Sequence, residues 1–79
     1  MNKYKEKELK KYVIADLSQP TNYLCSLGNA RYSFIDNIIV ATKFVARKSA
    51  QEICKECIKK FNLDLVVVPI VITYEIIEE

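Results

Sequence analysis

The chain has 79 residues, of which 51% are hydrophobic and 28% are charged, and its formal net charge is +2 at pH 7. This length supports one domain with one small core, and it leaves no room for a deep catalytic cavity between independent layers. A single glycine and two prolines argue against a disordered or low-complexity chain. The nearly balanced charge excludes a strong overall attraction to polyanions.

The first ten residues, 1–10, are predicted to be a charged arm that precedes a single domain of residues 11–79. Residues 2–11 hold five lysines, but they also hold Glu6 and Glu8. A purely basic arm favours nucleic acid, whereas interleaved lysine and glutamate are more typical of a solvated terminus. We therefore expect an exposed arm.

Three short strands are predicted in the first half of the domain, where β-branched and aromatic residues alternate with polar ones. They lie at residues 11–17, 22–27 and 31–35. Residues 18–21 carry turn chemistry, because proline fixes φ and donates no hydrogen bond. Gly28 and Asn29 tolerate positive φ, so they are expected to end the second strand.

Residues 38–45 are ambiguous by composition. Their β-branched residues favour a strand, whereas Ala41 and Phe44, three residues apart, favour a helical turn. We expect a short turn or 3₁₀ segment here, which leads into the main helix.

Residues 46–61 have the clearest periodicity in the chain, that of an amphipathic helix. The apolar residues recur at steps of three and four, at Ala46, Ala50, Ile53, Cys54, Cys57, Ile58 and Phe61. The helix is predicted to begin near Arg47 or Lys48 and to end at Phe61. Asn62 suits the left-handed conformation that terminates many helices.

Residues 63–77 are predicted to form a long final strand. It completes an α+β fold, in which a small antiparallel sheet of three to four strands packs on one helix in the order β-β-(β)-α-β. The face expected under the helix holds Val66, Val68, Ile70, Ile72, Tyr74 and Ile76. The opposite face holds Val67, Pro69, Val71, Thr73 and Glu75, and it is too apolar for a surface bathed in water.

This apolar second face predicts contact with another chain. Proline cannot donate to a ladder, so Pro69 places the strand at a sheet edge or a bulge. An edge strand that is apolar on both faces associates unless something covers it. We therefore expect a homodimer, with contact through Val67, Pro69, Val71 and Thr73.

Cys54 and Cys57 have the only metal-like spacing in the chain. Zinc takes four ligands, but only Cys25 remains and the chain has no histidine. A redox pair would lie at a helix N-terminus, where the dipole lowers the thiol pKa. Both cysteines fall in the apolar helical stripe instead, so we expect buried small hydrophobes and no metal site.

Neither catalytic residues nor a cofactor site are expected. Without histidine the usual general base near neutral pH is missing, and a single glycine cannot build a phosphate-binding loop. Three cysteines, a charged N-terminus and the shortness of the longest apolar run, residues 65–72, predict a cytoplasmic protein without membrane contact. A pocket for a small nucleotide between protomers stays open as an alternative.

Two kinds of binding surface remain. Basic residues on and near the helix are candidates for the rim of a protein-binding patch, namely Arg31, Lys43, Arg47, Lys48 and Lys55. Alternatively, aromatic side chains on an open sheet stack nucleobases, and the candidates are Tyr12, Tyr23, Tyr32, Phe34 and Tyr74. The same aromatic residues also suit half-buried strands, which favour them for packing reasons.

A series of short motifs runs along residues 11–61: Tyr12-Val13-Ile14, Tyr23-Leu24, Tyr32-x-Phe34, and Ala41-x-x-Phe44 followed six residues later by Ala50. This combination resembles small uncharacterised phage and prophage proteins of Gram-positive bacteria, which share a hairpin, an aromatic strand, a turn and one helix, usually followed by a last strand. The family commonly has a polar helix cap two residues after the phenylalanine, where this chain has Ala46.

Such phage proteins are similar in size and style to small inhibitors of bacterial immunity, including anti-CRISPR proteins. The resemblance therefore implies a non-enzymatic module that binds and inhibits a host protein in the bacterial cytoplasm. The alternative is a nucleic-acid-binding accessory protein that uses the basic arm and the sheet tyrosines.

Overall fold

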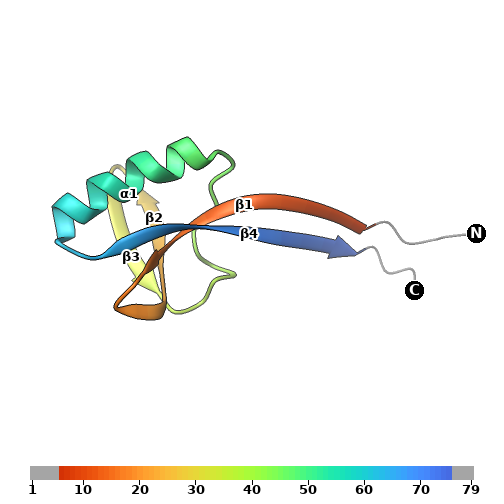
Figure 1. Cartoon of the computed structure of the whole chain (residues 1–79), viewed down its shortest axis with the longest axis horizontal. Helices are drawn as coiled ribbons and strands as arrows, with labels where there is room; N and C mark the ends of the chain where they lie inside the picture. Colours follow the sequence, from red (N-terminus) through yellow and green to blue (C-terminus); the bar gives the residue numbers. More distant parts are fainter. Residues whose placement is uncertain (1–5, 76–79) are drawn as a thin grey trace, which may run out of the picture.

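The computed structural model of the chain describes residues 6–75, which form four strands and one helix (Figure 1). The elements are β1 (Glu6–Asp16), β2 (Gln19–Gly28), β3 (Arg31–Ile35), α1 (Arg47–Phe61) and β4 (Leu65–Glu75). The strands make one antiparallel sheet in the spatial order β3-β2-β1-β4, with α1 packed on one side of it (Figure 1). The predicted α+β fold and its element order are confirmed.

The N-terminal arm prediction is wrong in its extent, because β1 already begins at Glu6. Residues 6–10 pair along their whole length with the end of β4, with Leu9 opposite Ile72 and Lys10 opposite Val71. Lysine and glutamate have low strand propensity, but the cross-strand ladder overrides that local preference. Residues 1–5 of the predicted arm lie outside the described residues.

The first hairpin turns earlier than predicted, at Leu17 and Ser18, and β2 begins at Gln19. Asp16 holds this turn, because its Oδ1 accepts hydrogen bonds from the Ser18 backbone N–H at 2.9 Å and from the Ser18 Oγ at 2.7 Å. Aspartate commonly bonds the backbone two residues on in this way, and the sequence signal from Pro20 masked it.

The hydrogen bonds from Ser18 hold the pKa of Asp16 below its usual value. The carboxylate therefore stabilises the fold at pH above the ordinary aspartate pKa of about 3.9, and this contribution is lost as the pH falls through the lowered folded-state value. We expect Ser18→Ala to raise the pKa of Asp16 in an NMR titration and to lower stability at neutral pH. The two proteins should converge in stability at strongly acidic pH; a constant difference at all pH values would contradict this account.

Residues 42–44 fill the gap where β1 and β2 diverge. Tyr12 exchanges backbone hydrogen bonds with Phe44 at 2.9 and 2.8 Å, and the Thr42 N–H donates to the Leu24 carbonyl at 3.2 Å. The Ser26 N–H also donates to the Thr42 Oγ1 at 2.7 Å. The expected turn in residues 38–45 is confirmed at residues 38–40. Residues 42–44 instead hydrogen-bond to β1 and β2.

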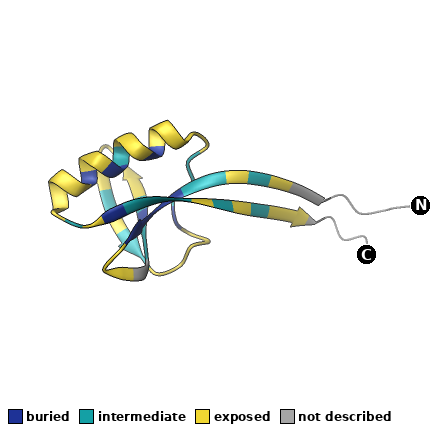
Figure 2. Cartoon of the chain, in the orientation of Figure 1, coloured by how far each residue is buried: buried dark blue, intermediate teal, exposed yellow. Residues whose placement is uncertain are grey.

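The core lies between α1 and the sheet, and Figure 2 shows the buried residues gathered there. Its fully or nearly fully buried members are Ile14, Leu24, Cys54, Cys57 and Leu65. Phe34, Phe44 and Val67 pack against this cluster from its margins. Burial of these side chains supplies the main driving force for folding in a domain of this size.

The helix has the predicted limits, Arg47–Phe61. Asn62 ends it in the left-handed conformation, with φ of 53°, and donates its backbone N–H to the Ile58 carbonyl at 2.9 Å. The predicted buried stripe is too long, because Ala46, Ile58 and Phe61 are exposed at its margins. Phe61 instead packs edge-to-face against Phe34, with 5.9 Å between ring centroids.

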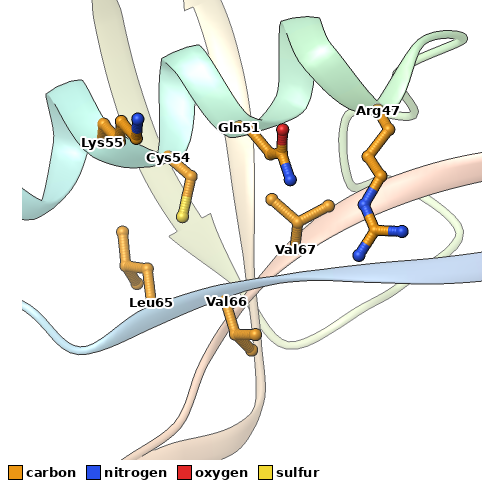
Figure 3. Close-up of a pocket in the computed structure, with 7 residues that line it drawn as sticks. All are labelled: Arg47, Gln51, Cys54, Lys55, Leu65, Val66 and Val67. Carbon is orange, nitrogen blue, oxygen red and sulfur yellow. The ribbon is translucent and has the colours of Figure 1, made fainter.

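The predicted orientation of the last strand is wrong beside the helix. Leu65 and Val67 point toward α1, and Val66 points away (Figure 3). Val67 lies opposite the fully buried Ile14 in the β1–β4 ladder, so both share the helix-facing side. Alternation alone could not choose between two apolar faces, and the pairing partner decided it.

Candidate functional site

The outer edge of β4 carries backbone groups that no strand of the described chain pairs with. The Leu17 N–H donates to the Asp64 carbonyl, and Tyr12 turns both of its backbone groups toward Phe44. These bonds fix which residues of β4 hydrogen-bond to β1. The backbone N–H and C=O groups of the even-numbered residues bond to β1, and those of the odd-numbered residues face away from the sheet. Pro69 is one of these residues, so of its two predicted places, a sheet edge or a bulge, the structure shows the edge, where the missing N–H removes no bond to β1.

The first candidate surface is a groove between α1 and the outer edge of β4, which we call the α1–β4 groove (Figure 3). Its lining residues are Arg47, Gln51, Cys54, Lys55, Leu65, Val66 and Val67. Leu65, Val67 and Cys54 give it an apolar floor, and Arg47 and Lys55 lie toward its opposite ends (Figure 3). The two basic residues are two turns apart on the helix, or about 12 Å along its axis. The groove therefore offers an extended ligand an apolar centre between two cations.

The second candidate surface lies where β1 and β4 continue past the helix as a two-stranded ribbon (Figure 1). We call it the ribbon groove, and its lining residues are Ile38, Ile39, Lys43, Ile70, Val71, Ile72, Thr73 and Tyr74. Ile39 is 80% exposed and Val71 62% exposed. Exposed apolar side chains gathered in one groove make it a candidate interaction surface.

Together, the two grooves account for most of the predicted partner-binding residues and dimer contacts. The α1–β4 groove brings together Arg47, Lys55 and Val67, although Val67 now forms part of the floor instead of an outward face. The ribbon groove joins Lys43 to Val71 and Thr73.

Some of the predicted residues lie outside both grooves. Arg31 opens β3, Lys48 is exposed on α1 and Pro69 lies on β4 between the grooves. Sequence reasoning missed Gln51, Ile38 and Ile39 as lining residues. The only signal for Ile38 and Ile39 was that they form an apolar pair in an irregular segment, and the sequence carried no signal for Gln51.

The aromatic residues proposed for nucleobase stacking are not brought to one surface. Tyr32 and Phe34 lie on the helix-facing side and pack against the Phe61 ring. Tyr23 is opposite Ala15, on the other side of the sheet, and Tyr74 lies far along the ribbon. The stacking platform that the alternative function needs is therefore not assembled.

The prediction that Cys54 and Cys57 are buried is confirmed, since they are 6% and 0% exposed. Burial is the main reason that the pKa of each thiol is raised, which disfavours the nucleophilic thiolate. Within residues 6–75, no three side chains of the metal-binding types lie close enough to hold an ion. The structure thus gives both cysteines a role in packing.

We expect Cys54→Ala and Cys57→Ala each to lower the free energy of unfolding by about 1 to 2 kcal/mol, because each change removes a buried sulfur and leaves a small void. Chemical denaturation with and without a zinc chelator measures the effect. Cys25→Ala is the control, because Cys25 is only partly buried. A chelator-dependent loss of stability would show that the thiols bind metal.

Comparison of the chain with protein-family models, with curated proteins and with solved structures found no match in any of the three. In the described part of the chain, no helix has the length and apolar content needed to cross a bilayer. The two grooves and the open edge of β4 are therefore the features of the described chain that bear on function.

Proposed function

We propose that this protein is a non-enzymatic binding module that acts by occupying another protein, with the outer edge of β4 and its two flanking grooves as the working surface. The observation that carries the proposal is the α1–β4 groove, where an unpaired strand edge, an apolar floor and two cations meet. Such an edge can add an extended segment of a partner through backbone hydrogen bonds, except the one that Pro69 cannot donate, and the adjoining groove selects its side chains.

The phage-like motifs of residues 11–61 make a bacterial host protein the first partner to test. In this proposal the module works in the host cytoplasm and inhibits its target by covering it, in the manner of an anti-defence inhibitor. An acidic target segment is favoured by Arg47 and Lys55, because complementary charge speeds association and selects the partner.

Affinity capture from a bacterial lysate, followed by mass spectrometry, tests the proposal. The bait is compared with an Arg47→Glu/Lys55→Glu double variant, and a Lys48→Glu/Lys59→Glu double variant serves as the charge-matched control. We expect a host protein that the bait and the control retain and the groove variant loses. Equal capture by all three baits would contradict the use of this groove.

An oligonucleotide titration at several salt concentrations tests the alternative function, nucleic-acid binding. Binding that falls steeply with added salt and is unchanged in the groove variant would favour the alternative. Absence of binding at low salt would remove it.

A further inference from the structure

The turn that follows β3 is held in place by its own hydrogen bonds. The Asn37 Oδ1 accepts from the Ile39 N–H at 3.0 Å, and the Asn37 carbonyl accepts from the N–H groups of Val40 and Ala41 at 3.1 and 3.2 Å. The Lys43 ammonium donates to the Ile39 carbonyl, and the Ala41 side chain is buried. The shape of this turn is therefore set before a partner arrives, which lowers the entropic cost of binding.

This turn exposes a run of apolar side chains. Ile38, Ile39 and Val40 are all exposed, and such a run at a protein surface is unusual unless it serves an interaction. Ile38 and Ile39 line the ribbon groove together with residues 70–74 of β4. Two segments distant in the sequence thus contribute apolar surface to one groove.

We propose that the ribbon groove binds an amphipathic helix of another protein, one whose apolar face is flanked by carboxylates. The inference rests on the proposed function in taking this groove as part of the working surface. It adds the kind of segment that is bound there and the charge of that segment.

The charges around the groove select an acidic partner. Lys43 lines it, and Lys11 lies opposite Ile70 in the β1–β4 ladder, on the same face of the sheet. Of the lining residues that the structure describes, none is acidic, and Glu8 and Asp36 line neither groove. A second copy docked face to face in this groove would bring the lysines of both copies together, which like-charge repulsion opposes. A partner with carboxylates beside its apolar face meets no such repulsion.

Hydrogen bonding and length favour a helix in this groove. The N–H groups of Ile39 and Val40 already donate within the turn, and among the strand residues that line the groove only Val71 and Thr73 have open backbone groups. An extended ligand would therefore leave most of its buried backbone groups unpaired, whereas a helix pairs its own. Residues 70–74 span about 13 Å of strand, enough for helical anchors at i, i+4 and i+7, which cover about 10 Å of helix axis.

Selection from a displayed library of helical peptides, each of about four turns, tests the proposal. The anchors at i, i+4 and i+7 are fixed as leucine, the flanking positions are randomised, and the unaltered chain is the bait. We expect the enriched peptides to carry Asp or Glu at the flanks, and the purified peptides to shift the NMR signals of Ile39 and Tyr74 but not those of Leu27. Failure to enrich any peptide, or enrichment of basic flanks, would overturn the proposal.

Variants of exposed residues show which side chains the selected peptides contact. We expect Ile39→Ser to weaken binding by about tenfold, and Val45→Ser, the control on an exposed residue that lines neither groove, to leave it unchanged. Lys43→Glu should shift the selection toward basic flanks. Lys11→Glu should act in the same direction without removing a hydrogen bond of the turn. Equal binding by the unaltered chain and Ile39→Ser would overturn the use of this groove.

A membrane surface is the other partner that an apolar turn with nearby lysines attracts. Co-sedimentation of the unaltered chain with phosphatidylserine vesicles, lost in Ile39→Ser, would overturn the proposal in favour of a membrane contact. The test of the proposed function is separate, because the lysate capture depends on Arg47 and Lys55 of the α1–β4 groove. A failed peptide selection leaves that capture unchanged, and a failed capture leaves an enriched peptide bound.

Discussion

Val71→Lys is expected to be a monomer at protein concentrations at which the unaltered chain is a dimer. Val71 is 62% exposed and lies on the outer edge of β4, where its N–H and carbonyl face the incoming strand. The lysine would lie next to Lys10, which is directly opposite on β1, and like charges at opposite positions are destabilising. Lysine on an edge strand is also a common means by which proteins prevent strand addition.

Light scattering coupled to size-exclusion chromatography measures this change as a fall in mass from two chains to one. Val45→Lys is the matched control, because Val45 is 73% exposed and lines neither groove. The control should keep the mass of the unaltered chain. If Val71→Lys remains dimeric, the outer edge of β4 is not the contact between copies.

Leu24→Ala is expected to lower the free energy of unfolding by about 3 to 4 kcal/mol, from the transfer energy of the lost carbon atoms and the cavity that they leave. Leu24 is fully buried between the sheet and α1, in the same cluster as Ile14 and Cys57. A chain of this length has a total stability of roughly 4 to 12 kcal/mol. The substitution therefore removes a large share of the total stability. If that stability is near the lower end of this range, we expect a measurable unfolded population.

Leu27→Ala provides the matched control, since Leu27 lies on the same strand but is 54% exposed. Leu27→Ala should lower the free energy of unfolding by less than about 1 kcal/mol, because Leu27 buries little apolar surface in the folded chain. Urea denaturation followed by circular dichroism compares the two. Equal losses would mean that the packing of β2 under α1 is not the source of stability.

Local sequence patterns were sufficient to predict those elements in which the pattern of apolar residues has one possible buried face. The helix limits, the left-handed Asn62 and the burial of Cys54 and Cys57 all follow from a periodicity of three and four residues that has one apolar face. The edge position of Pro69 follows from its missing donor. In each case one residue type or one spacing restricts the chain to very few low-energy arrangements.

Tertiary pairing decided the rest. Residues 6–10 are a strand because β4 lies beside them, and Val67 faces the helix because it is paired with Ile14. Arg47 and Lys55 line one groove only because α1 packs along β4. A strand that is apolar on both faces, or rich in lysine and glutamate, has no preferred orientation of its own. Its orientation is set by hydrogen bonds and contacts with segments distant in the sequence, which a local pattern does not contain.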